Sequence, residues 1–119
     1  PQEVHAAFSA HEHRFGVHAG EVETSMLLHL APEQVQMARA QNFASTSATR
    51  AQRFAILGNG KSAKLGWAMQ DYNPAGAAGN AAAADAQRGQ ALVEAAAQGL
   101  AQLLQEMHQL PLDTVGPAY

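Results

Sequence analysis

The sequence contains no cysteine, few aromatic residues and few charges. The lack of cysteine excludes disulfides, thiolate nucleophiles and cysteine-type zinc sites, and it favours a reducing compartment, so we expect a cytoplasmic protein. A formal net charge of −3 argues against binding to a phosphate backbone, and we expect no nucleic-acid partner. No apolar run approaches the roughly 20 residues that span a bilayer, and the first three residues lack the basic start of a signal peptide. We therefore expect no membrane partner.

Alanine supplies much of the 47% apolar content of the chain. Alanine buries little apolar area compared with leucine, isoleucine or phenylalanine, so 119 residues of this composition predict a shallow core. The length allows one small domain. The chain begins at Pro1 rather than at a methionine, which suggests a fragment or a processed product. We expect residues 1–119 to form a single, partial domain that depends on contacts with something else.

Two segments have the apolar periodicity of helices. Apolar residues recur on one helical face from 20 to 30, and Pro32 stops this helix and begins a short turn. Strong helix formers predict one long helix over about 81–109. Gly89 and Gly99 each cost such a helix about 1 kcal/mol relative to alanine, so they predict close backbone packing. The apolar positions are Val22, Met26, Leu27 and Leu30 in the first helix and Leu92, Ala96, Leu100, Leu103 and Met107 in the second.

The remaining segments give weaker signals. Residues 1–17 are interpreted as a loop, and the apolar run 53–57 is the one plausible strand. The turn pair Asn59-Gly60 would join this strand to a second extended piece at 65–69, so a hairpin is possible. The glycine-bearing loop at 73–80 is long enough to be a candidate for function, although it lacks the lysine of a phosphate-binding loop.

Six histidines in a chain of this length suggest chemistry at a site. His11, His13 and His18 lie near carboxylates, and imidazole with carboxylate is the ligand set of zinc, manganese or iron as well as the set for acid–base catalysis. The spacing of these histidines matches no metal-binding signature. Two interpretations stay open: a self-contained metal site built on the three, or solvated loop histidines.

The run from His18 to Leu28 places a histidine just before the start of a helix. Gly20 permits the turn into the helix, and Glu23 lies in the first helical turn, where the helix dipole favours a carboxylate. His18 and Glu23 would then face a common cavity. The alternative is that Glu23 only accepts hydrogen bonds from local amides while His18 is a polar loop residue.

Residues 18–25 read H-A-G-E-V-E-T-S, which resembles the H-A-G-x-x-E-T-S signature of the creatininase family of metal-dependent amidohydrolases. The resemblance continues at 30–35, which is similar to the family's L-x-P-x-x-V, and at Gly66-Trp67 and 70–80. The segment 84–89 is similar to the family's A-T-A-E-K-G, which opens the last helix. The resemblance covers nearly the whole chain, but only the C-terminal half of a typical member.

The resemblance implies an α/β fold, specifically the C-terminal part of a three-layer α/β/α creatininase-like domain, helix-rich as an isolated chain. It also implies a dinuclear metal site, with zinc, manganese or iron as the cofactor. Such a site hydrolyses the C–N bond of amides, including cyclic ones, by a metal-activated water. The two motifs that supply most of the family's metal ligands are not found in this sequence.

The resemblance assigns His18 to proton transfer toward the leaving nitrogen. It assigns Glu23 to orienting His18, a water or a metal, and Glu23 is the one metal ligand that this chain would offer. We place Gly20 and Trp67 at the substrate, where Trp67 either stacks on a planar substrate or simply packs. Asp85 stands where the family usually has threonine, so a capping role there is in doubt.

The sequence therefore predicts a creatininase-like amidohydrolase that acts on a small amide substrate, represented by a piece without the main metal ligands. Its partners would be the N-terminal half of the same enzyme or a partner chain, and further copies of itself in a homo-oligomer. Alone, the chain is expected to be inactive. The alternative is a non-catalytic binding or assembly module derived from the same fold. The upstream metal motifs, on the same gene or on a partner chain, would separate these alternatives.

Overall fold

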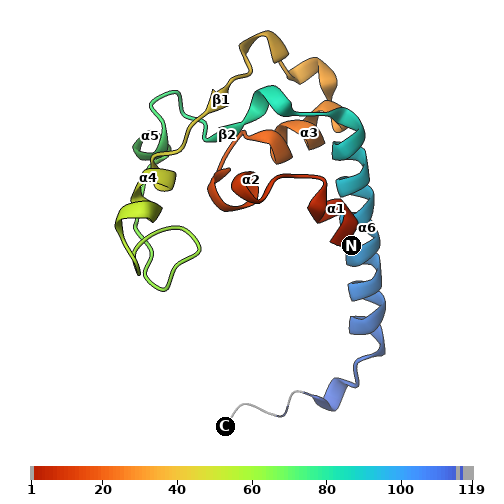
Figure 1. The fold of residues 1–119 in the computed structure, drawn as a ribbon. Helices are drawn as coiled ribbons and strands as arrows, with labels where there is room; N and C mark the ends of the chain where they lie inside the picture. Colours follow the sequence, from red (N-terminus) through yellow and green to blue (C-terminus); the bar gives the residue numbers. More distant parts are fainter. Residues whose placement is uncertain (1, 115, 117–119) are drawn as a thin grey trace.

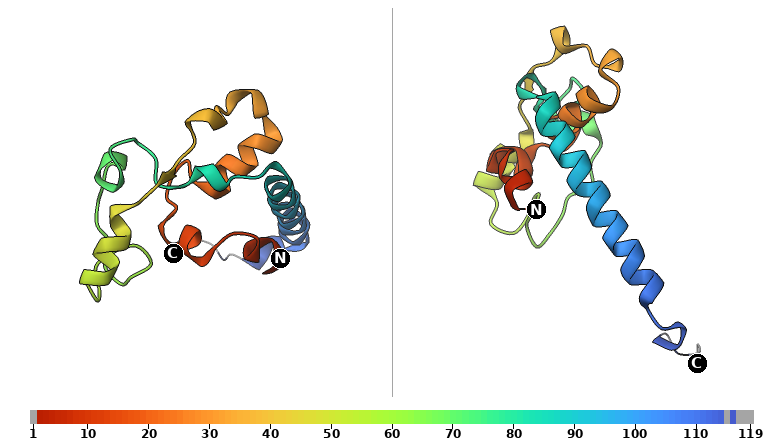
Figure 2. Two further views of the ribbon diagram at one scale, coloured as in Figure 1. Left: turned by 45° about the horizontal axis from the view of Figure 1, so that its top comes forward. Right: turned by 90° about the vertical axis from the view of Figure 1, so that its right-hand side faces the viewer.

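Two helices form the centre of the molecule. The computed structural model describes residues 2–114 and 116, and its most extensive contact joins α3 (Glu21–Leu30) to α6 (Ala86–Gln109). The helix α6 begins where the Asp85 side chain accepts the Arg88 N–H at 2.8 Å, an N-cap that fixes its first turn. In Figures 1 and 2, α3 packs on the N-terminal half of α6, whose C-terminal half projects away from the rest.

The contact between α3 and α6 is a backbone contact. Ser25 is fully buried, and a Cβ atom added to Gly89 would overlap the backbone carbonyl of Ser25. The Ser25 hydroxyl donates to the Glu21 carbonyl at 2.6 Å and accepts the Asp85 N–H at 2.9 Å, which ties the start of α6 to α3. The close packing expected at Gly89 is therefore confirmed, whereas Gly99 has nothing within 4 Å of its added Cβ.

The sheet is small and positions the segment before α3. The strands β1 (Asn42–Phe43) and β2 (Gly79–Asn80) are antiparallel, with Asn42 opposite Asn80 and Phe43 opposite Gly79. An isolated bridge pairs His18 with Ala78, directly before β2. The Val17 N–H donates to the Ala78 carbonyl at 2.8 Å, and the Ala78 N–H donates to the His18 carbonyl at 2.8 Å. The chain between α2 and α3 thus runs beside the end of the glycine-bearing loop.

The N-terminal segment contains two helices, so the expectation of a loop over 1–17 is wrong. These are α1 (Gln2–Ala6) and α2 (Ala10–Phe15). Ser9 caps α2, because its Oγ accepts the Glu12 N–H at 3.0 Å. The order Ser9-Ala10-His11-Glu12 is the S-x-x-E signature of a helix start. Phe8, between the two helices, is buried.

Residues 44–73 form an arm on the other side of the sheet (Figure 1). It contains α4 (Thr46–Arg53) and α5 (Met69–Tyr72). The prediction of a strand at 53–57 is wrong. The Ser45 side chain caps α4 by accepting the Ser47 N–H at 3.2 Å, and the helix continues to Arg53. The expected hairpin does not form either. Leu57 makes an isolated parallel bridge with Ala63, and residues 65–68 are irregular.

Short 3-10 turns connect these elements. They comprise η1 (Pro32–Gln34), η2 (Met37–Arg39), η3 (Ala81–Ala83) and η4 (Leu112–Thr114). The turn expected after Pro32 is confirmed. The last helix begins at Ala86 rather than near 81, because 81–83 take up η3 and Asp85 provides the cap. Among the described residues, the helices are too short or too polar for any of them to cross a membrane.

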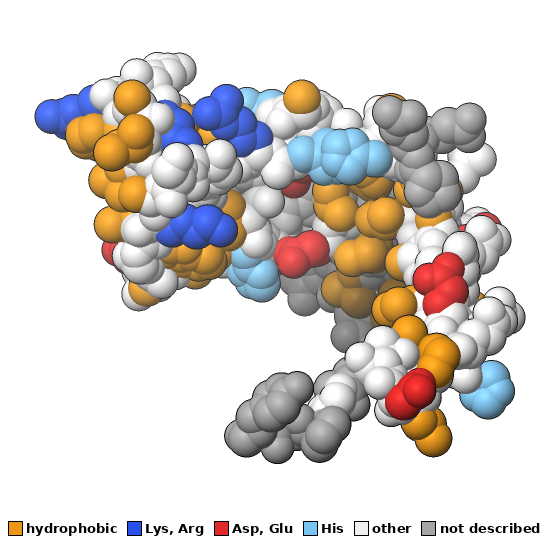
Figure 3. Space-filling view, turned by 90° about the horizontal axis from the view of Figure 1, so that it is seen from below, with side chains coloured by type: hydrophobic (Ala, Val, Ile, Leu, Met, Phe, Trp, Pro, Cys, Tyr) orange, Lys and Arg blue, Asp and Glu red, His pale blue; other side chains and the backbone are white. Residues whose placement is uncertain are grey.

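The molecule is extended. Its radius of gyration is 18.1 Å, whereas about 13.5 Å is typical of a compact domain of this length. The outer half of α6 exposes four large apolar side chains, Leu100, Leu103, Leu104 and Met107, and its C-cap residue Leu110 is exposed as well. Charge is also segregated: residues 34–70 carry five of the seven basic residues and no acidic residue. Figure 3 shows Lys and Arg side chains gathered at the end of the molecule opposite α6.

Candidate functional site

The turn that enters α3 presents His18 at the molecular surface. Ala19 has a φ of +51°, a left-handed conformation that non-glycine residues rarely adopt. Gly20 is the N-cap of α3, and it has no side chain to accept a capping hydrogen bond. Ala19 and Gly20 thus form the turn between the bridge at His18 and the first turn of the helix.

Glu23 lies beside His18. The distance from His18 Nδ1 to Glu23 Oε2 is 3.6 Å, and the two side chains are 59% and 52% exposed. The same carboxylate oxygen accepts the Ala19 N–H, so Glu23 also satisfies a backbone donor at the start of α3. The sequence presented two alternatives: Glu23 faces a common cavity with His18, or it only accepts a local amide hydrogen bond. In the structure Glu23 does both.

His18, Gly20 and Glu23 line a cavity of about 250 Å³ at the N-terminus of α3. Trp67 is not among the residues that line this cavity. It lies on the arm, where its ring packs edge-on against Tyr72 with a centroid separation of 4.6 Å, and it is 46% exposed. The structure thus brings three of the four predicted site residues together and places the fourth against a buried tyrosine.

Glu12 is a functional candidate that the sequence reasoning did not single out. It is 4% exposed and lines the same cavity. Its Oε1 accepts the Glu21 N–H at 2.7 Å, and its Oε2 accepts the Asn80 N–H at 3.0 Å. A Cβ atom added to Gly16 or Gly20 would overlap this carboxylate. The signal in the sequence was the capping order before Glu12, followed by two glycines spaced four residues apart.

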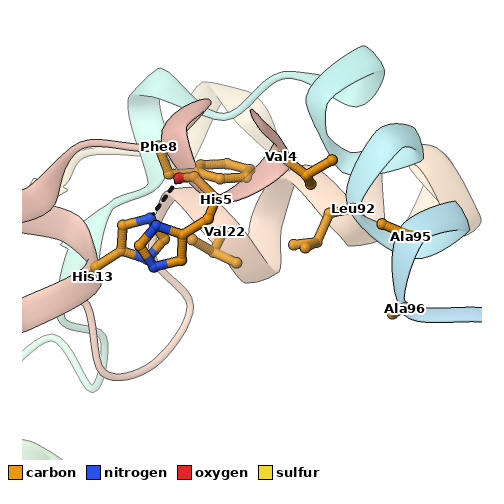
Figure 4. A pocket seen from close by; sticks show the side chains of 8 residues that line it. All are labelled: Val4, His5, Phe8, His13, Val22, Leu92, Ala95 and Ala96. Atoms are coloured by element: carbon orange, nitrogen blue, oxygen red, sulfur yellow. Dashed lines mark hydrogen bonds between the residues drawn. The ribbon is translucent and has the colours of Figure 1, made fainter. Parts of the chain in front are cut away.

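His13 also lines the cavity of His18, but its ring packs against the ring of His5. The His13 ring stacks on His5 with a centroid separation of 3.6 Å and an interplanar angle of 5°, and its Nε2 lies 2.8 Å from the His5 carbonyl oxygen. These two rings close one end of an apolar cavity of about 290 Å³ between α1, α3 and α6 (Figure 4). His11 packs against Phe15. The structure does not support a metal site built on His11, His13 and His18.

The residues present do not complete a metal centre. Within residues 2–114 and 116, no three His, Asp or Glu side chains are arranged to hold a metal ion. His18 and Glu23 together offer two donor groups, whereas zinc sites take three or four protein ligands. A metal at this site would need further ligands from outside the chain.

An ion pair joins the start of α3 to α6. Glu21, the first residue of α3, is buried and pairs with Arg88 on α6. The Arg88 guanidinium also donates to the Ala7 carbonyl at 3.0 Å and lies 5.1 Å from the centre of the Phe8 ring. One side chain therefore connects the end of α1, the start of α3 and the start of α6.

Comparison with known proteins identifies the fold. The family model described as creatinine amidohydrolase matches residues 1–104. The chain belongs to the creatininase family. A crystal structure from Bacteroides fragilis, named "Putative creatinine amidohydrolase", is similar to 92% of this chain with 28% sequence identity and a TM-score of 0.66. No curated protein matches the sequence.

These findings confirm the resemblance seen in the sequence, together with the prediction of a helix-rich part of a creatininase-like fold. The aligned region covers 42% of the Bacteroides fragilis chain, so this chain spans less than half the length of its structural neighbour. Membership of the family supports an amidohydrolase-like function at the level of the family.

Proposed function

We propose that the chain supplies the acid–base part of an amidohydrolase site that cleaves the C–N bond of a small amide. The observation that carries the proposal is the pairing of His18 Nδ1 with Glu23 Oε2 at 3.6 Å in the wall of an open cavity. Imidazole gives and takes protons near neutral pH, and a partner carboxylate is the usual means of orienting it. The same residues carry the match to the family signature.

In this proposal Glu23 sets the tautomer of His18. The carboxylate lies 3.6 Å from Nδ1, an ion-pair distance, and its negative charge favours a proton on the Nδ1 side, which leaves Nε2 for the substrate. The protonated ring then donates from Nε2 to the amide nitrogen as the C–N bond breaks. The Ala19 N–H donates to the same Glu23 oxygen, which keeps the imidazole partner in place.

The rest of the site would come from the N-terminal half of a creatininase-family enzyme, on the same polypeptide or on a partner chain. A bound zinc, manganese or iron ion supplies Lewis-acid chemistry and an activated water in metal hydrolases. Glu23 is the residue of this chain that would contribute a ligand. The chain by itself is expected to show no turnover, because two donor groups do not hold such an ion.

The test is complementation. The chain is joined to the N-terminal half of the Bacteroides fragilis protein, loaded with zinc or manganese, and assayed with creatinine and simple formamides. His18→Ala is expected to lower kcat by about 10²–10⁴-fold, the usual contribution of a positioned acid–base group, with unchanged metal content. Glu23→Gln is expected to lower kcat as well, because an amide holds the imidazole less firmly.

His29→Ala is the matched control, because His29 is an exposed histidine in the last turn of α3, the helix that contains Glu23. If His18→Ala removes the metal while the loaded fraction keeps full activity, His18 is a ligand rather than an acid. If the metal-loaded fusion is inactive with His18 and Glu23 intact, the non-catalytic assembly module becomes the better interpretation.

A further inference from the structure

Glu12 is a buried carboxylate that the proposed mechanism does not use. Its two oxygens accept backbone N–H groups from Glu21 and Asn80, at 2.7 and 3.0 Å. No Lys, Arg or His side chain among residues 2–114 and 116 lies within ion-pair distance of it. Burial of an ionised carboxylate is costly unless hydrogen bonds replace water, and here backbone amides do so.

The two amides that Glu12 binds belong to two segments next to His18, the start of α3 and the segment that pairs with the His18 backbone. Glu21 begins α3, three residues after His18, and Asn80 follows Ala78, whose backbone is paired with His18. The Glu12 carboxylate thus connects the start of α3, which follows the His18 turn, to β2, which follows Ala78. Since each oxygen binds a different segment, both are needed at once.

Three glycines make room for this arrangement. Added Cβ atoms would overlap the Glu12 carboxylate at Gly16 and Gly20, and one at Gly79 would come within 2.6 Å of Oε1. Gly79 also has a φ of +140°, which side chains rarely allow. The backbone therefore closes around a single carboxyl group from α2, β2 and the start of α3.

We propose that Glu12 is the positioning residue of His18, acting through the backbone of the turn 16–20 and not by contact with substrate. The chemical role of His18 rests on the proposed function, but the positioning does not. Glu12→Gln replaces one acceptor oxygen by an NH₂ group that faces an N–H, so one of the two fastenings is lost. The His18 turn should then loosen while the contact between α3 and α6 remains.

The geometry can be tested without a variant. In the full chain, through-hydrogen-bond scalar couplings should connect the amide nitrogens of Glu21 and Asn80 to the side-chain carboxyl carbon of Glu12. The absence of both couplings from a folded chain would overturn the proposal.

The positioning is tested by amide hydrogen exchange. Glu12→Gln should lower the protection of the Ala78 amide by about 10-fold or more and leave the amides in the middle of α6 unchanged. The control is Glu21→Gln, which removes an equally buried carboxylate that faces Arg88 instead. If Glu12→Gln lowers protection equally at Ala78 and in α6, the role of Glu12 is merely structural. The same conclusion follows if Glu21→Gln lowers the protection of the Ala78 amide as much as Glu12→Gln does.

The functional consequence is measured in the complemented enzyme. Glu12→Gln should lower kcat by about 10-fold or more with KM and metal content unchanged, because the acid is misplaced rather than removed. Unchanged kcat in an active fusion would overturn the proposal. Failure of the unsubstituted fusion would count against the function alone, since couplings and exchange judge Glu12 independently of activity.

Discussion

Two glycines in α6 should respond to alanine with opposite signs. Glycine in a helix interior costs about 0.8–1.0 kcal/mol relative to alanine, so Gly99→Ala, with nothing within 4 Å, should stabilise the chain by about that amount. At Gly89 the same gain is opposed by overlap with the Ser25 carbonyl and a 2.8 Å approach to the Met26 nitrogen. Overpacking typically costs about 1–3 kcal/mol, and more where backbone must move. We expect Gly89→Ala to destabilise the chain by about 2 kcal/mol.

Urea unfolding followed by circular dichroism at 222 nm measures both variants. The two unfolding free energies should differ by about 3 kcal/mol, with midpoints shifted in opposite directions and unchanged slopes. The pair shares one helix and one chemical change, so helix propensity cancels and the difference reports the contact between α3 and α6. Equal stabilisation by both substitutions would refute the close backbone packing of these helices.

Three further predictions concern the backbone of Ala19, the Glu21–Arg88 ion pair and the exposed leucines of α6. Ala19→Gly should stabilise the chain by about 1 kcal/mol in thermal unfolding, because glycine adopts the positive φ of Ala19 without strain; destabilisation would contradict this. Arg88→Met should cost about 3 kcal/mol by leaving the buried Glu21 unpaired, and adding Glu21→Gln should recover part of the loss, whereas additive losses would show that the pair is not coupled. Light scattering should show self-association that grows with concentration, because the outer half of α6 exposes a row of leucines; a monodisperse monomer would count against it.

The parts of the fold that the sequence predicts are those with strong local causes. The helix α3 follows from its apolar spacing and from Pro32, and it spans Glu21–Leu30 as expected within one residue. The long helix follows from its helix formers, but its start was placed too early, because alanine-rich residues 81–83 favour a helix until Asp85 offers a better cap. The approach of His18 to Glu23 also follows from spacing, since both belong to one short turn.

The parts that the sequence does not predict depend on contacts between distant residues. The run at 53–57 is apolar, yet Phe54 and Ile56 lie exposed and no strand pairs with them except through the bridge at Leu57. Glutamate is a residue type that usually lies on the surface, and the burial of Glu12 depends on a backbone amide 68 positions away. Local pattern contains no information about such a partner.

The family signature is largely a description of backbone geometry. Gly20 has no side chain that would overlap the Glu12 carboxylate, and the Glu23 carboxylate accepts the Ala19 N–H. The Thr24 hydroxyl donates to the Ala19 carbonyl at 3.4 Å, and Ser25 joins α3 to the start of α6. Each of these residues has a structural reason to be present, so the signature alone identifies the fold more firmly than it identifies the reaction.

His18 is different from its neighbours in this signature. Its backbone pairs with Ala78, but any residue can supply that backbone, and its side chain is 59% exposed with Glu23 as its ion-pair partner. Removing an exposed side chain away from caps and cores changes stability by at most about 0.5 kcal/mol, so His18→Ala should leave the unfolding midpoint nearly unchanged. A loss of activity in that variant would then be chemical in origin. Of the polar signature residues, His18 is the one whose side chain has no role in packing or local backbone hydrogen bonds, which is why the proposed reaction is placed on it.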